Sequence, residues 1–175
     1  TPSYQRLVGL VVMICRPLTQ AQHGIWVGQQ MVPDSGAYWT AEALSLQGEM
    51  NEATWQQATD HVLRHAQSLH LQVDAQGQAH YPPLPLAHAV PMHTLDVSDQ
   101  NAPWDAAWQA IEALRPPAPQ MDQDPLFAQA WIRLSPAHHL WVLWAHHVVL
   151  DGWGHALLAR AVAQTYEHLT QGRPA

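Results

Sequence analysis

The spacing of apolar side chains predicts an ordered mixture of helices and strands along most of the chain. Apolar residues recur at helical spacing between Asn51 and Leu69, and Asn51 stands where an N-cap residue accepts the first free amide hydrogens. Shorter apolar runs bounded by turn residues predict strands. The pattern predicts further helices at Pro103–Leu114 and Trp153–Thr170, and strands at Ala41–Leu46, Leu69–Val73, Ala79–Tyr81, Leu126–Leu134 and His139–His147.

The last two strands are predicted to be antiparallel neighbours, joined by the short turn at residues 135–137. Both alternating sets of positions in the second strand are apolar, so this strand is expected to be central and covered on both faces. The predicted fold class is α/β, a two-layer sandwich in which helices cover a mixed or antiparallel sheet. The final helix is expected to gather its apolar residues on one side, namely Trp153, Ala156, Leu157, Ala161 and Leu169.

Composition narrows the class of protein. The 175 residues, 47% of them hydrophobic, are enough for one compact domain. Acidic residues number 14 against 7 basic ones, and every basic residue is arginine, which argues against nucleic-acid binding. The single cysteine, Cys15, allows no internal disulfide and favours a reducing, cytoplasmic location. The apolar run Leu7–Cys15 is too short to cross a bilayer, so no membrane association is expected.

The thirteen histidines include two adjacent pairs, His138–His139 and His146–His147. Neighbouring side chains on a strand point to opposite faces, so neither pair can chelate an ion, and no metal site is predicted. His147 differs from the others because it ends a buried strand just before a turn at Asp151–Gly152. An imidazole placed there can accept a proton near neutral pH, or can simply satisfy backbone carbonyls at the strand end.

The string AHHVVLDGW, from Ala145 to Trp153, resembles the HHxxxDG signature of condensation domains of non-ribosomal peptide synthetases. The string PLTQAQHGIW, from Pro17 to Trp26, is similar to the opening motif of that family. Residues Asp34–Tyr38 and Leu44–Gly48 also resemble it, especially in siderophore-type synthetases. The resemblance implies a chloramphenicol acetyltransferase-like fold. We therefore expect residues 17–175 to be the N-terminal lobe of a condensation domain, and residues 1–16 to be a leader or upstream segment.

The resemblance implies amide formation between two carrier-bound substrates, in which the acceptor amine attacks the donor thioester. It places His147 at the catalytic position, where it takes the proton of the amine or holds the amine for attack. His146 is expected to be structural, Asp151 to make a structural ion pair, and Gly152 to let the substrate arm approach closely. The domain itself is expected to bind no cofactor, since carrier proteins deliver the phosphopantetheine arms.

Two residues depart from the family pattern. His70 stands where the family usually has the arginine that pairs with the signature aspartate, so His70 is expected to pair with Asp151 only when protonated. Gly154 stands where a serine is common. Family members are also about twice as long, so a C-terminal lobe and adjacent synthetase domains are expected as partners, and this chain alone is expected to be inactive.

Two other functions remain open from the sequence. A coenzyme A-dependent acyltransferase shares the HxxxD core, so the chain could be half of such an enzyme. A docking or scaffold lobe without catalytic activity would also explain the loss of the arginine at position 70.

Overall fold

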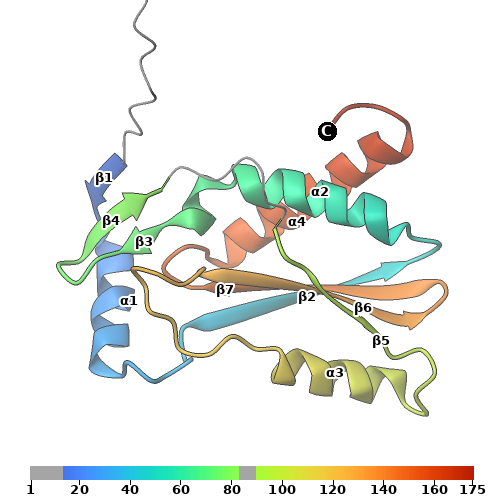
Figure 1. The fold of residues 1–175 in the computed structure, drawn as a ribbon, viewed down its shortest axis with the longest axis horizontal. Coiled ribbons are helices and arrows are strands. Elements are labelled where there is room, and N and C mark those ends of the chain that lie inside the picture. The colour runs from blue at the N-terminus through green and yellow to red at the C-terminus, as the bar shows by residue number, and fades with distance from the viewer. Residues whose placement is uncertain (1–13, 83–89) are drawn as a thin grey trace, which may run out of the picture.

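The computed structural model describes residues 14–82 and 90–175, which form a mixed α/β domain (Figure 1). Residues 1–13, which include most of the apolar run at residues 7–15 and most of the predicted leader, lie outside the described residues. The elements in chain order are β1 Ile14–Pro17, α1 Gln20–Met31, β2 Trp39–Gln47, α2 Glu52–His65, the 3-10 helix η1 Gln67–His70, β3 Gln72–Val73, β4 Gln78–Tyr81, β5 His93–Asp96, α3 Pro103–Ala113, β6 Phe127–Ser135, β7 His138–His146 and α4 Gly152–Thr170.

The larger sheet has the strand order β2-β7-β6-β5. Strands β2, β7 and β6 are antiparallel neighbours, and β5 runs parallel to β6, so the sheet is mixed. The predicted hairpin of β6 and β7 is confirmed, and β7 lies between two partners as expected. Its alternating residues enter two different cores: Trp141 and Leu143 enter one, and Val142 and Trp144 enter the other.

Helices cover both faces of this sheet (Figure 1). Trp55 and Leu63 of α2 and Val162 of α4 pack in the core on one face. Ala107 and Ile111 of α3 pack on the opposite face. The α/β fold with a mixed, helix-covered sheet is therefore confirmed. Helices on both faces and the sheet between them make three layers, one more than the predicted two-layer sandwich. The extra layer is needed because an apolar strand such as β7 must be covered on both sides.

A smaller sheet of order β1-β4-β3 lies beside α1 (Figure 1). Strands β3 and β4 form an antiparallel hairpin, with Gly77 at a φ of +74° in the turn. Arg16 pairs with Ala79 across β1 and β4. Residues 14–16, the last part of the segment predicted to precede the lobe, therefore pair with β4 in the smaller sheet.

Helix α4 turns a different face to the core from the one predicted. Trp153 and Leu157 are 74% and 51% exposed, although the sequence places them on the apolar side. The buried positions are His155 and Val162. The remaining contacts to the core come from Leu158, Ala159, Tyr166 and Leu169. The apolar residues of α4 extend around more than one face, so periodicity alone does not identify the face that packs against α2.

Candidate active site

His147 is the first residue after β7, and two backbone carbonyls hold it. Its amide donates to the carbonyl of Tyr38 at 2.8 Å, which ties it to the residue just before β2. Its ring Nδ1 lies 3.1 Å from the carbonyl of Leu150. A carbonyl can only accept, so Nδ1 carries the proton and Nε2 keeps its lone pair in the neutral ring. His147 is exposed as a whole residue, and its Nε2 makes no hydrogen bond to the residues that the structure describes.

His146 points to the other side of the strand and is fully buried. Its Nδ1 accepts from the amide of Val148 at 3.3 Å, and its Nε2 donates to Oε1 of Gln29 at 3.2 Å. The two adjacent histidines therefore hold opposite tautomers. Burial lowers the pKa of His146 to about 4, with a further contribution from the neighbouring His147. His146 is neutral near pH 7, when both of these hydrogen bonds form.

Asp151 begins α4 as its N-cap. Its Oδ1 accepts from the amide of Gly154 at 2.7 Å. The next residue, Gly152, borders open space, because a Cβ added there has no atom of the described residues within 4 Å beyond its chain neighbours and its own helix backbone. A Cβ at Gly154 would lie 2.5 Å from the end of the Leu150 side chain, so the serine common in the family would require Leu150 to move.

The expected pair between His70 and Asp151 is not formed. Nε2 of His70 lies 2.9 Å from the carbonyl of Leu63, and the ring of His70 meets that of Phe127 edge to face at 5.4 Å. No ion pair joins His70 to Asp151 within residues 14–82 and 90–175. Burial lowers the pKa of His70, so it is a poor substitute for a permanently charged arginine.

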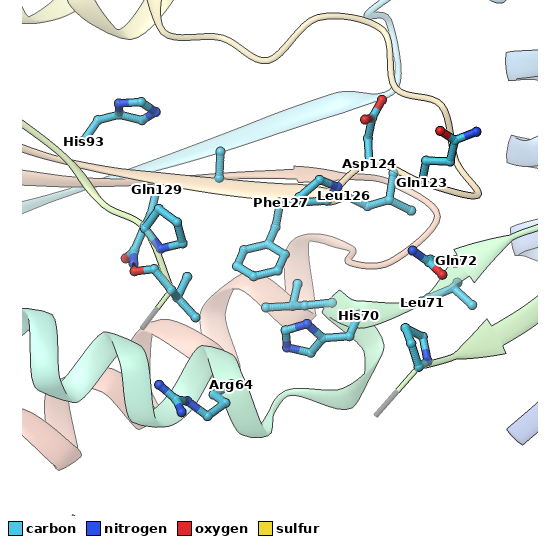
Figure 2. A pocket seen from close by; sticks show the side chains of 16 residues that line it. Arg64, His70, Leu71, Gln72, His93, Gln123, Asp124, Leu126, Phe127 and Gln129 are labelled. Carbon is cyan, nitrogen blue, oxygen red and sulfur yellow. Dashed lines mark hydrogen bonds between the residues drawn. The ribbon is translucent and has the colours of Figure 1, made fainter. Parts of the chain in front are cut away.

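His70 instead lines a cavity of about 510 Å³ between the end of α2, the start of β6 and the segment before β5. Figure 2 shows His70 and Phe127 on the wall of this cavity, with Arg64 reaching it from α2 and Asp124 on the opposite side. His147 is not among the residues that line it. None of residues 146–151 lines it, although Leu126, whose carbonyl accepts from the amide of His146, does.

Three residues near the loop carry no obvious sequence signal. Gln29 is 2% exposed and bonds to His146. His155, in the first turns of α4, is 4% exposed and donates from Nε2 to Thr40 at 3.2 Å, while Thr40 donates to the carbonyl of Ala145 at 3.0 Å. These bonds join residues more than 100 positions apart, so no local pattern could reveal them.

The described part of the chain carries neither a cluster of metal-binding side chains nor a helix that could span a membrane. No group of three or more histidine, cysteine, aspartate or glutamate side chains lies close enough there to hold a metal ion. No helix in those residues has the length and apolar character needed to cross a membrane.

Comparison with known proteins agrees with the sequence resemblance. Residues 15–175 match the family model for the condensation domain. The chain is 39% identical over 163 residues to an isonitrile lipopeptide synthase from Streptomyces coeruleorubidus, and 34% identical over 160 residues to a dimodular nonribosomal peptide synthase from Bacillus subtilis (strain 168). These alignments cover 91% and 90% of this chain.

Solved structures show the same relationship. The starter condensation domain of rhizomide synthetase matches 93% of this chain with a TM-score of 0.82 and 33% identity. The first condensation domain of the calcium-dependent antibiotic synthetase matches 93% of it with a TM-score of 0.82 and 29% identity. This chain spans 11% and 7% of the lengths of the two synthases, and 41% and 40% of the two solved chains. Because the family model matches nearly all of its length, the chain belongs to the condensation-domain family.

Proposed function

We propose that this chain supplies the catalytic histidine of a condensation domain, which joins an acyl or aminoacyl thioester to an amine acceptor. The observation that carries the proposal is the state of His147: an exposed residue whose Nδ1 is engaged by Leu150 and whose Nε2 has no hydrogen-bond partner among residues 14–82 and 90–175. A lone pair in that position can receive a proton or a hydrogen bond from an amine.

In the proposed reaction the nitrogen of the acceptor amine attacks the carbonyl carbon of the donor thioester. A C–N bond forms, the C–S bond breaks, and the proton that the amine loses ends on the departing sulfur, so the donor arm leaves as a thiol. Nε2 of His147 takes that proton, or holds the amine in line with the carbonyl while another group takes it. His146 and Asp151 support the loop, and Gly152 leaves room beside it for a substrate arm.

The rest of the domain is part of this proposal. Two large apolar side chains of α4, Trp153 and Leu157, are exposed one helical turn apart, next to the catalytic loop. The solved relatives are longer than this chain. We propose that a C-terminal lobe, like the additional part of those relatives, covers this surface and excludes water from the site. Carrier proteins would deliver both substrates on phosphopantetheine arms, and the domain would bind no cofactor of its own. The chain's single cysteine fits a reducing, cytoplasmic location.

A donor comparison tests this function in the full-length protein that contains this sequence. The protein is supplied with an aminoacyl acceptor on its carrier and with the same acyl group on either a carrier or coenzyme A. We expect amide product, measured by intact mass, from the carrier-bound donor. One solved relative is in complex with C8-CoA, so a free acyl-coenzyme A donor is a real alternative. Product from coenzyme A alone would favour the acyltransferase, and no product from either donor would favour a scaffold lobe.

Gly152 offers a test of substrate approach that spares the fold. We expect Gly152→Leu to lower the rate of amide formation at least tenfold, because the added side chain would fill the open space beside the loop. Folding should be preserved, since a Cβ at this position borders open space. Gly24→Leu is the matched control, because Gly24 in α1 has the same free surroundings. Wild-type rates in Gly152→Leu, with normal thermal unfolding, would contradict the proposed path.

A further inference from the structure

Helix α1 holds the residues on either side of His147. Gln29 binds the ring of His146, and Gln22 binds the backbone of Val148. We infer that Gln22 and Gln29 are positioning residues, which fix the catalytic loop from one helix. The inference rests on the proposed role of His147 and adds the residues that set its geometry.

Gln29 is a buried junction of hydrogen bonds. Its side-chain nitrogen lies 3.1 to 3.2 Å from three carbonyls of the segment after α1, which share its two N–H donors. With this nitrogen facing carbonyls, the side-chain oxygen is the group that faces His146, and it accepts from Nε2. His146 must then leave Nδ1 unprotonated, which is the state that accepts from the amide of Val148. Gln29 therefore selects the tautomer of His146 that the loop requires.

Gln22 performs two tasks with the two ends of one amide group. Its side-chain oxygen accepts from the backbone amide of Thr19 at 3.1 Å, while Thr19 Oγ1 accepts from the backbone amide of Gln22. This reciprocal pair is a capping box, and it begins α1. Its nitrogen donates to the carbonyl of Val148 at 3.0 Å. The start of the helix and the catalytic loop are therefore joined through a single side chain.

Together these contacts hold both polar groups of the Val148 backbone, the amide by His146 and the carbonyl by Gln22. A further loop bond runs from the amide of Val149 to the carbonyl of His146 at 2.9 Å. His147 lies between these fixed points, so a shift of Val148 would change the direction of its ring. Misplacing a catalytic group by about 1 Å can lower a rate roughly a hundredfold.

The variant Gln22→Glu separates the two tasks of Gln22 in the full-length protein. Glutamate keeps the acceptor that the capping box needs, and a negative charge near a helix N-terminus is favourable. It removes the donor to Val148. We expect kcat for amide formation to fall roughly ten- to a hundredfold, with KM for both carriers and the melting temperature little changed. Gln20→Glu is the matched control, because this substitution adds the same negative charge at an exposed position in the same turn of α1.

The ring nitrogens of His147 give an independent readout. In the wild type, ¹⁵N shifts should report a proton on Nδ1 of His147 and on Nε2 of His146. In Gln22→Glu the His147 signal should shift or broaden. Gln29→Met, compared with the exposed control Gln30→Met, should alter the His146 signal and lower kcat. Gln29 also satisfies three carbonyls, so Gln22→Glu decides the question if Gln29→Met does not fold.

The outcomes distinguish this inference from the proposed function. A kcat within twofold of wild type in Gln22→Glu, with unchanged His147 shifts, would overturn the positioning role while leaving the catalytic role of His147 intact. A fall in melting temperature that accounts for the lost activity would also overturn it. If replacing His147 itself leaves amide formation unchanged, the proposed function fails instead.

Discussion

Replacing His147 by alanine is expected to lower kcat for amide formation by a factor of about 10² to 10⁴ in the full-length protein, the usual contribution of a positioned acid or base. The loss follows from the geometry of the loop. Nδ1 is occupied by the carbonyl of Leu150, so Nε2 is the atom of His147 that can meet the amine. The measurement is single-turnover product formation with both carriers loaded.

His147→Gln separates the two roles that remain open for this residue. Glutamine places a hydrogen-bonding group near the position of Nε2 but cannot accept a proton near neutral pH. If His147 acts as a base, the glutamine and alanine variants should lose similar activity. If it holds the amine, glutamine should keep much of the rate. His168→Ala, at an exposed site on α4, is the control for histidine removal, and wild-type activity in His147→Ala would contradict any catalytic role.

The sequence was most informative where local pattern and tertiary packing agree. The β6–β7 hairpin could be predicted because β7 is apolar at both sets of alternating positions, which only a central, covered strand allows. The start of α2 could be predicted because the side chain of Asn51 caps it, accepting from the amide of Thr54 at 2.9 Å. Both signals act within a few residues of the structure they predict.

The wrong predictions concern contacts that depend on how separate elements face each other. Hydrophobicity alone predicts that Trp153 and Leu157 of α4 face the core. Both are exposed, so this prediction of the buried face is wrong. The pair of His70 and Asp151 was inferred from the partner that the family usually has. In this fold, histidine at position 70 finds the carbonyl of Leu63, and Asp151 caps its own helix. Each side chain therefore makes its hydrogen bond to a group nearby in the sequence, and not to the other.

Helix α1 combines a local signal that the sequence shows with long-range contacts that it does not. The Thr19-to-Gln22 spacing is a local capping-box pattern that could have predicted the start of the helix. The bond from Gln22 to Val148 spans 126 positions, and the bond from Gln29 to His146 spans 117, so neither has a sequence signature. The opening motif and the HHxxxDG motif thus meet in space through contacts that only the fold shows.

Acid should destabilise this fold through the buried ring of His146. The pKa of His146 falls from 6.5 to about 4 because the ring is buried, so between these values the unfolded chain binds a proton that the folded chain does not. Stability therefore rises with pH over this window: the contribution of His146 is complete above pH 6.5 and is lost as the pH falls to about 4. A shift of about 2.5 units corresponds to about 3 kcal/mol. Asp74 differs, since a hydrogen bond from His80 lowers its pKa and keeps it ionised to lower pH.

The variant His146→Asn tests this linkage. Asparagine does not titrate, and its side-chain oxygen can stand near the position of Nδ1 and accept from Val148. The variant should be less stable than wild type at pH 7.5, because the donor to Gln29 and part of the buried ring are lost. Between pH 7.5 and 4.5, however, wild type should lose about 2 to 3 kcal/mol more than the variant, measured by urea unfolding with tryptophan fluorescence. Parallel pH profiles for the two proteins would show that His146 does not carry the acid sensitivity, and that its buried ring is not held neutral by the fold.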